Sequence, residues 1–197
     1  DRVKANIEKC SNSTILCGFG RVGQEVARHL YQNNLSFVVI DEDEHNVMLA
    51  KKRGYIVLHE DASKNKVLEQ AGINHGANTI LCTTGDDVTN VYITLTSRYL
   101  NPDINIISRA NREDNVKKLY QAGANHIVQP FTAAGLLAAE YLGQPVAFQA
   151  IHGILHEEKD VQIDALTVYP DCFLDGLMVH EANIDQYKAR LLGIVSD

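Results

Sequence analysis

Three glycines near the start of the chain have the spacing of a phosphate-binding turn. Gly18, Gly20 and Gly23 follow a short apolar run over 14–17 and precede a helical apolar pattern over about 21–33. In dinucleotide-binding proteins the first glycine of G-x-G-x-x-G permits a tight turn, the second admits a pyrophosphate, and the third lets the helix pack close to the strand. The N-terminus of that helix would add N–H donors and a positive dipole end.

An acidic residue ends the next apolar run. Asp41 follows 37–40 and lies 18 residues after Gly23, near the distance at which an acid accepts the ribose hydroxyls of a nucleotide. A carboxylate there repels a 2′-phosphate, so we expect NAD(H) or an adenine nucleotide (ATP, ADP or AMP) and not NADP. Glu42, Asp43 and Glu44 could bind the ligand directly, but they could equally well complement the dipole of the next helix. The alternative for the whole stretch is a glycine-rich turn that binds nothing.

The composition limits the classes of protein to which this chain can belong. The chain has 197 residues and a net charge of −7, and without a basic run it is not expected to bind nucleic acid. Cys17 and Cys82 lie in apolar runs, which predicts buried reduced thiols and a cytoplasmic compartment. We find no signal peptide or membrane span. The chain begins without Met and ends in an apolar run, as expected of a piece of a larger protein.

Short apolar runs alternate with helical patterns along residues 14–130. This alternation predicts a parallel sheet with helices on both faces, doubly wound in the order 3-2-1-4-5-6. A nucleotide would then lie across the carboxyl ends of the first and fourth strands, where the order reverses. The expected strands are 14–17, 37–40, 56–59, 78–82, 104–107 and 127–128.

The pattern changes after the sixth strand. Residues 131–142 are apolar almost all round and 146–155 are also apolar, so they need burial on more than one side and favour a protein–protein interface. Strand-like alternation begins near residue 159. We therefore expect four parts: a linker over 1–13, a Rossmann-type domain over 14–130, a crossover helix and dimerisation segment over 131–158, and a partial C-terminal α+β lobe over 159–197.

Several motifs together resemble one family over about residues 14–156. They are Gly18-Phe-Gly-Arg-Val-Gly23, Val39-Ile-Asp41, Glu60-Asp61-Ala62, Thr83 to Asp87 with Asn90, Ser108-Arg109, and Ala122 to Pro130. This set resembles the RCK domain (regulator of potassium conductance, also called KTN or TrkA-N), most like the cytoplasmic domain of a prokaryotic potassium channel. The resemblance implies a crossover helix that packs on a partner subunit, dimers that assemble into an octameric ring beneath the membrane, and a potassium pore domain upstream.

The resemblance also implies roles for individual residues. Asp41 would hold the adenosine ribose, Asp61 and Ala62 would flank the adenine, and Arg109 would reach a phosphate. Arg21 and Arg109 have a separate physical case, because both should stand at the carboxyl edge of the sheet, where a pyrophosphate needs cationic bidentate donors. The full set of candidate cofactor-binding residues is Gly18, Phe19, Gly20, Arg21, Val22, Gly23, Asp41, Glu42, Asp61, Ala62, Thr83, Thr84, Gly85, Asp86 and Arg109.

No metal site is expected. Calcium-gated members of the family carry acids where this chain has Arg109-Ala-Asn111, although Asp86 and Asp87 remain available. His152 and His156, with Glu157 adjacent, have zinc-ligand spacing on a helix, but a solvated helix end is favoured.

Three functions follow from these patterns. The first is a ligand-sensing regulatory domain of a potassium channel, at the cytoplasmic face of the membrane and without catalytic residues. The second is the regulatory domain of a Kef- or Trk/Ktr-type potassium transporter. The third is an NAD-dependent oxidoreductase, which would need a substrate lobe and an acid/base group that we cannot nominate.

Overall fold

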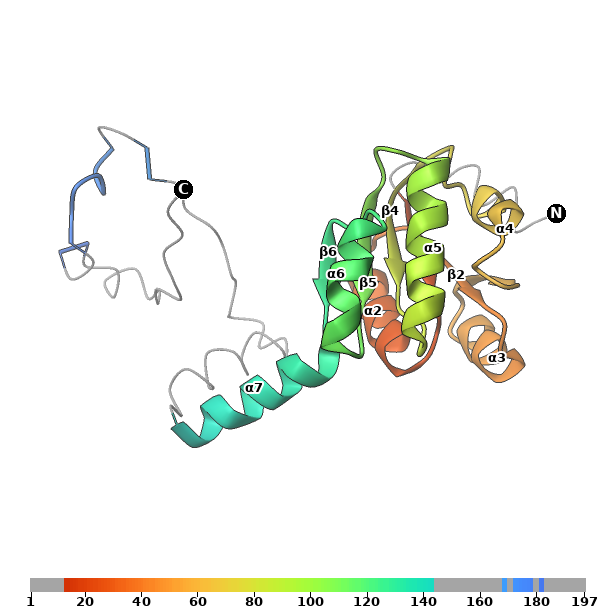
Figure 1. Cartoon of the computed structure of the whole chain (residues 1–197), viewed down its shortest axis with the longest axis horizontal. Coiled ribbons are helices and arrows are strands. Elements are labelled where there is room, and N and C mark those ends of the chain that lie inside the picture. The colour runs from red at the N-terminus through yellow and green to blue at the C-terminus, as the bar shows by residue number, and fades with distance from the viewer. Residues whose placement is uncertain (1–12, 144–167, 170–171, 179–180, 183–197) are drawn as a thin grey trace. The chain divides into compact units, whose positions relative to one another are not determined.

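The computed structural model describes residues 13–143, 168–169, 172–178 and 181–182 (Figure 1). The chain divides into two compact units, residues 1–143 and 144–197. The first contains alternating strands and helices, as predicted. These are β1 (Ser13–Cys17), α2 (Arg21–Gln32), β2 (Phe37–Asp41), α3 (Glu44–Lys52), β3 (Ile56–His59), α4 (Asn65–Gln70), β4 (Ala77–Cys82), α5 (Asp87–Leu100), β5 (Asn105–Arg109), α6 (Glu113–Gln121), β6 (His126–Val128) and α7 (Pro130–Gly143).

The six strands form one parallel sheet in the order β3-β2-β1-β4-β5-β6. This is the predicted doubly wound arrangement, and the order reverses between β1 and β4. Cys17 at the end of β1 is in register with Ile40 of β2 and Cys82 of β4, so the loops that follow these strands begin side by side. The strand ends where we predicted the ligand therefore lie along one edge of the sheet.

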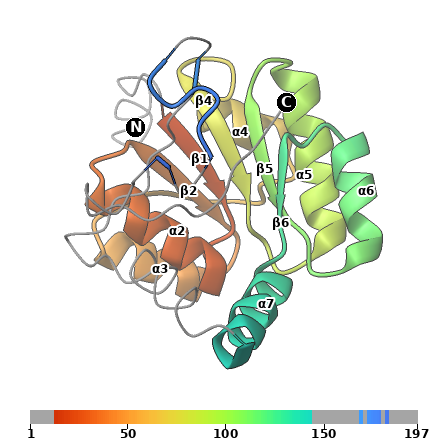
Figure 2. The same cartoon turned by 90° about the vertical axis from the view of Figure 1, so that its left-hand side faces the viewer.

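An apolar core lies on each face of the sheet. Figure 2 shows α2 and α3 on one side of the strands, with α5 and α6 on the other. Leu16, Val39 and Val57 point toward α2 and α3, where they pack with Phe19, Ala27 and Ala50. Ile15, Ile80 and Ile106 belong to the second core, which includes Leu68 of α4, Ile93 of α5 and Leu119 of α6. Alternate residues of each strand face opposite cores, as a parallel sheet covered by helices requires.

The α2–α3 side covers only half of the sheet. On β5, Ile106 faces the second core and is fully buried, whereas Ile107 on the opposite face is half-buried. Val128 of β6 is 45% exposed. A groove runs along α2, on the same side of the sheet, and is lined by Arg21, Val22, Glu25, Val26, His29 and Leu30. Within residues 13–143, therefore, the face shared with α2 lacks a cover over β5 and β6.

Helix α7 is present, and the part of it whose side chains are described is largely exposed. Phe131 and Leu136 are 58% and 63% exposed, so the predicted burial of this apolar helix does not come from residues 13–143. No helix in the described part of the chain has the length and apolar character to span a bilayer. The linker was predicted over 1–13, but Ser13 is already the first residue of β1. The predictions for the rest of the linker, for the apolar stretch 146–155 and for most of the segment 159–197, including the boundary near 158, lie outside the described residues.

Candidate nucleotide-binding site

The three glycines of the first turn have three different reasons to be glycine. Gly18 has a φ of +94°, and a Cβ there would lie 2.9 Å from the backbone N of Thr84. A Cβ at Gly23 would lie 2.0 Å from the carbonyl oxygen of Gly18. A Cβ at Gly20 would meet nothing within 4 Å. The first and third glycines are therefore required by the fold, and the second leaves open space at the start of α2, as predicted for a phosphate.

The N-terminus of α2 fits an anion. Gly20 is its N-cap and no side chain among the described residues caps it, so its first N–H groups can serve a ligand. Arg21 begins the helix and is exposed. A guanidinium beside uncapped N–H groups is a suitable environment for a phosphate. The residues present at this turn therefore fit the phosphates of a nucleotide.

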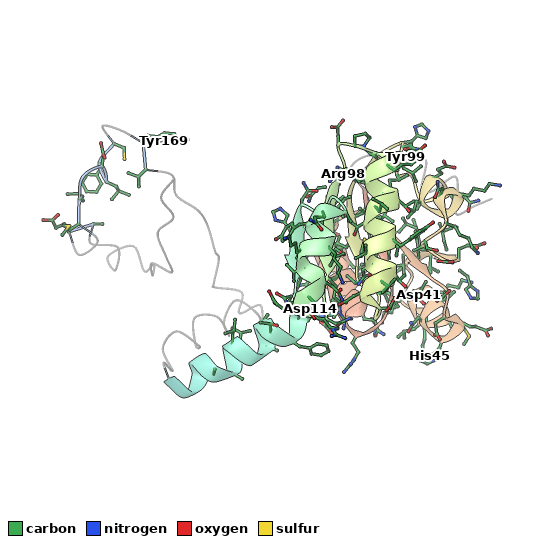
Figure 3. All side chains as sticks on the ribbon, in the orientation of Figure 1. Asp41, His45, Arg98, Tyr99, Asp114 and Tyr169 are labelled. Atoms are coloured by element: carbon green, nitrogen blue, oxygen red, sulfur yellow. The ribbon has the colours of Figure 1, made fainter. Side chains whose placement is uncertain are left out.

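Asp41 lies at the end of β2 and connects three segments (Figure 3). Its carboxylate accepts a short hydrogen bond from the backbone N–H of Phe19 and a bond of 2.8 Å from the N–H of Asp43. The side-chain amide of Asn46 lies 3.3 Å away. The predicted ribose acid is thus buried and holds the glycine turn against the start of α3. The Asn46 amide contacts both carboxylate oxygens, at 3.4 and 3.3 Å, so a ribose hydroxyl would compete with these long contacts.

The end of β4 is joined to β1 and β5 by two polar side chains. The hydroxyl of Thr83 donates to the carbonyl oxygens of Cys17 at 3.1 Å and Gly18 at 2.9 Å. Asn90, fully buried at the start of α5, accepts from the Thr84 N–H and donates to the carbonyl oxygens of Thr84 and Arg109. Both predicted threonines therefore lie at the site, and the Thr83 hydroxyl is already engaged in supporting the glycine turn.

Asp87 organises the loop that follows β5. It is buried and accepts bonds from the backbone N–H groups of Asn111 at 2.8 Å and Arg112 at 3.0 Å, and from the side-chain amide of Asn115 at 2.8 Å. Burial raises the pKa of this carboxyl, but the hydrogen bonds from Asn115, Asn111 and Arg112 outweigh it and hold the pKa below its usual value. Asp87 is therefore an anion bound by this loop, and is not available as a calcium ligand without dismantling it.

Arg109, the last residue of β5, is held by two groups. Its Nε and Nη2 donate to Oδ1 of Asn111 at 3.0 and 2.6 Å. Its guanidinium carbon lies 5.6 Å from the centre of the Phe131 ring, within cation–π range. Phe131 is the second residue of α7. The predicted phosphate arginine is thus in contact with the helix predicted to mediate dimerisation.

The remaining predicted residues divide between the site and its framework. Gly85 is exposed beyond β4, and Asp86 caps α5 by accepting from the N–H and hydroxyl of Thr89. Those bonds lower the pKa of Asp86. Asp61 accepts from the N–H of Ser63, and hydrogen bonding by Ser63 lowers its pKa. Glu42 is exposed, Val22 is half-buried and Ala62 is buried.

Phe19 differs most from a typical ligand residue. Its ring is fully buried and packs edge-on against Tyr55, with ring centres 6.0 Å apart. Gln24 donates to its carbonyl oxygen. Its side chain therefore belongs to the α2–α3 core, and only its backbone borders the site. Asn111 and Phe131 were not among the predicted site residues, although both contact Arg109. No periodic pattern could have indicated them, because Asn111 lies in an irregular loop two residues after Arg109 and the Phe131 contact joins the end of β5 to the start of α7.

Cys17 and Cys82 are buried and free, as predicted. Burial raises the pKa of Cys82 to about 12, and burial together with the neighbouring Cys82 raises the pKa of Cys17. Both thiols are reduced and inaccessible. In the part of the chain that the structure describes, no group of His, Cys, Asp or Glu could hold a metal ion. His152 and His156 lie outside that part.

Comparison with known proteins places this geometry in a family. The family model for the TrkA-N domain matches residues 14–130. The chain belongs to the TrkA-N family. This result confirms the resemblance drawn from the motifs. The TrkA-N domain of the inner membrane protein ybaL from Escherichia coli is a solved structure with the same fold; its TM-score is 0.64, with 27% identity over 68% of this chain and 98% of that one.

Several relatives of this TrkA-N chain are potassium transport proteins. It is 33% identical to potassium channel protein 1 of Methanocaldococcus jannaschii over 80% of this chain and 47% of that protein. The GsuK channel bound to NAD has a TM-score of 0.62 and 33% identity over 73% of this chain and 25% of that one. KefC of Escherichia coli, a glutathione-regulated potassium-efflux protein, is 32% identical over 66% of this chain and 21% of its own length. The chain thus spans about half the length, or less, of these relatives.

Proposed function

We propose that this chain is the nucleotide-sensing regulatory domain of a potassium channel. The observation that carries the proposal is the open turn at Gly20 with the uncapped N-terminus of α2, where the carboxylate of Asp41 binds the N–H of Phe19. Relatives that span the same family domain are potassium channels. In this proposal the chain lies at the cytoplasmic face of the membrane, attached to a pore domain that precedes it.

The ligand we propose is NAD(H) or an adenine nucleotide. A solved GsuK structure is described as bound to NAD and another as bound to ADP. In this chain Asp41 lies where a ribose would be bound, and its charge disfavours a 2′-phosphate. The uncapped helix and two arginines would balance the phosphates. The phosphate cradle would be formed by Gly18, Gly20, Arg21 and Gly23. Asp61 and Ala62 would flank the adenine, and Thr84 and Arg109 would contact the ligand from the ends of β4 and β5.

The dimer we propose forms through α7. This helix carries exposed apolar residues, and the sheet has a face over β5 and β6 that lacks a cover within residues 13–143. Both are surfaces of one chain that two copies could bury reciprocally, as a two-fold interface requires. The groove along α2 adds further apolar lining on the same side of the sheet, from Val22, Val26 and Leu30. Burial of α7 against a second copy would explain its apolar composition.

A closed ring needs a second and different interface, and α5 offers one. Val88, Tyr92, Leu95 and Tyr99 follow one another at helical spacing and are 55–80% exposed. Figure 3 labels Tyr99 near the end of α5 that lies away from Asp41. Isolated apolar residues on a surface are ordinary, but a stripe along three turns of a helix is typical of an interface. Two different surfaces per copy would allow dimers to assemble further, and the family resemblance implies a ring of eight.

Regulation would follow from differential affinity. A nucleotide shifts the equilibrium between two dimer conformations only by as much as it binds one better than the other. Because Arg109 contacts Phe131 of α7, a phosphate bound by this arginine would act close to the dimer interface. No chemical step is needed for this role.

Two alternatives remain distinct from this proposal. The similarity to KefC favours a potassium transporter as the second candidate, and the residues that precede the chain in its full-length protein would decide between a channel and a transporter. An oxidoreductase would need a general acid or base beside the ligand. Among the described residues near the turn, Asp41, Asp86 and Asp87 are engaged with backbone N–H groups, which supports a role without catalysis.

The first test is nucleotide binding by the 197-residue chain and by Gly20→Ala. We expect NAD(H), ADP or AMP to bind and NADP to bind more weakly. The backbone of Gly20, with φ −69° and ψ −167°, accepts an alanine, so the variant should keep its unfolding free energy within about 0.5 kcal/mol. Its methyl group would occupy the phosphate approach, and affinity should fall by roughly a hundredfold, about 2.7 kcal/mol. Isothermal titration calorimetry that detects no binding of any adenine nucleotide by the unaltered chain would reject the proposal.

The second test concerns assembly. Leu136→Asp puts a charge on the exposed face of α7 and should convert the dimer into a monomer, because an interface does not bury an unpaired carboxylate. Met48→Asp is the matched control, since Met48 of α3 is 57% exposed but lies outside the proposed surfaces. Sedimentation velocity should show a monomer for the first variant and the parent species for the second. Equal behaviour of the two variants contradicts an interface through α7.

A further inference from the structure

The orientation of Arg109 depends on a neighbouring amide. Two of the five N–H donors of its guanidinium, on Nε and Nη2, point to the same oxygen, Oδ1 of Asn111. Three donors remain for a ligand. A planar guanidinium held at two of its nitrogens cannot rotate about its last bonds without breaking both hydrogen bonds. Asn111 therefore determines which way the charged group of Arg109 faces.

Asn111 is itself held in one orientation. Its Nδ2 donates to the carbonyl oxygen of Gly85 and to Oδ1 of Asp87, both at 2.9 Å. Its backbone N–H donates to Oδ1 of Asp87 at 2.8 Å. Because both acceptors require the amino group, the amide cannot flip, and its oxygen must face Arg109. The chain of contacts thus runs from buried Asp87 through Asn111 to the guanidinium.

An amide suits this task better than a carboxylate would. A carboxylate at position 111 would form a stronger pair with Arg109 but would neutralise the charge that a phosphate needs. It would also stand beside the carboxylate of Asp87, which is the partner of the present amide. A neutral oxygen holds the guanidinium and leaves its positive charge uncompensated by that contact.

We propose that Asn111 is a positioning residue for phosphate recognition, which acts by pre-orienting Arg109. This inference rests on the proposed nucleotide-binding function. An arginine that must be ordered on binding costs about 0.5–1.5 kcal/mol in side-chain freedom, and this cost is avoided when the side chain is already held. The same contacts also support the loop after β5, so a purely structural role must be separated by experiment.

A double-mutant cycle makes this separation. Affinity for ADP is measured by titration calorimetry for the unaltered 197-residue chain, Asn111→Ala, Arg109→Ala and the double variant, well below their melting temperatures. We expect Asn111→Ala to weaken ADP binding roughly three- to tenfold, the factor that corresponds to the ordering cost. In the Arg109→Ala background the same change should have an effect of less than about twofold, because the group it orients is gone.

The other outcomes are equally decisive. Equal losses in both backgrounds would show that Asn111 acts independently of Arg109 and would overturn the inference, as would no loss in either. If Asn111→Ala fails to fold, Asn111→Ser replaces it, since a serine hydroxyl can still donate to Asp87 but is too short to hold Arg109. Absence of ADP binding by the unaltered chain is a different failure. It would reject the proposed function, and the inference with it, before any variant is compared.

Discussion

Replacing Gly23 by alanine is expected to destabilise the domain by about 3–5 kcal/mol, in the range of severe core substitutions. The added Cβ would lie 2.0 Å from the carbonyl oxygen of Gly18, 3.0 Å from its carbonyl carbon and 3.1 Å from the hydroxyl of Thr83. The close atoms are backbone atoms of the turn and cannot rotate away as a flexible side chain could. Relief requires α2 to move away from β1, which would open the α2–α3 core around Phe19 and Ala27.

The comparison with Gly20→Ala makes this prediction specific. Both substitutions add one methyl group in the same turn, but a Cβ at position 20 meets nothing within 4 Å. Urea denaturation monitored by circular dichroism should show a large loss of stability for Gly23→Ala and almost none for Gly20→Ala. Similar midpoints for the two variants would mean that α2 does not pack against the turn at the distance described. A large loss for Gly20→Ala would mean that the space beside it is not open.

The order of the sheet could be predicted because each strand and helix carries its own local pattern. Val22, Val26 and Leu30 repeat at helical spacing, and the short apolar runs between glycines and acids can only be strands of a covered parallel sheet. Right-handed crossovers then leave few arrangements. The tasks of Gly18, Gly20 and Gly23 were predictable for a similar reason, since each follows from position within one short turn.

Contacts between loops could not be predicted from the sequence. Thr83 was predicted as a ligand contact, yet its hydroxyl bonds to carbonyl oxygens 66 and 65 residues away. Asn111 was noted only as a departure from a calcium site, and its place between Asp87 and Arg109 depends on the meeting of the loops after β4 and β5. Phe19 resembles a ligand residue because it stands inside the glycine motif, but the direction of its side chain is set by the aromatic cluster with Tyr55 and Phe37.

The incomplete cover of the sheet links these observations to assembly. In a doubly wound sheet each face of every strand needs a helix or another apolar layer. In residues 13–143 the α2–α3 side leaves Ile107 half-buried and Val128 exposed, while α7 presents an apolar surface of its own. A sequence pattern shows that α7 requires burial but does not show where its cover is. The uncovered face over β5 and β6 is a second apolar surface on the same chain, against which α7 of another copy could be buried.

Replacing Asp41 by alanine is expected to reduce both nucleotide affinity and stability. Binding of NAD(H) or ADP should weaken by one to two orders of magnitude, because a hydrogen bond to a charged group contributes about 1.5–3 kcal/mol. Stability should fall by about 1–3 kcal/mol, since the substitution leaves the buried N–H of Phe19 without its acceptor, whereas the N–H of the exposed Asp43 can turn to water. The first N–H helps to shape the glycine turn, so the two losses have one physical origin.

Glu42→Gln is the matched control for Asp41→Ala. It removes the same charge one residue further on. The side chain of Glu42 is exposed, and the bond that Glu42 makes among the described residues is the one between its carbonyl oxygen and the ring of His59, at 3.0 Å, which favours the helix-dipole alternative over direct binding. We expect its affinity to change less than about twofold and its stability less than about 0.5 kcal/mol. Titration calorimetry and urea denaturation of both variants at the same ionic strength provide the measurements. An unchanged affinity for Asp41→Ala would remove this carboxylate from the ribose site, and an equal loss in Glu42→Gln would show that the ligand senses the local charge and not the geometry of Asp41.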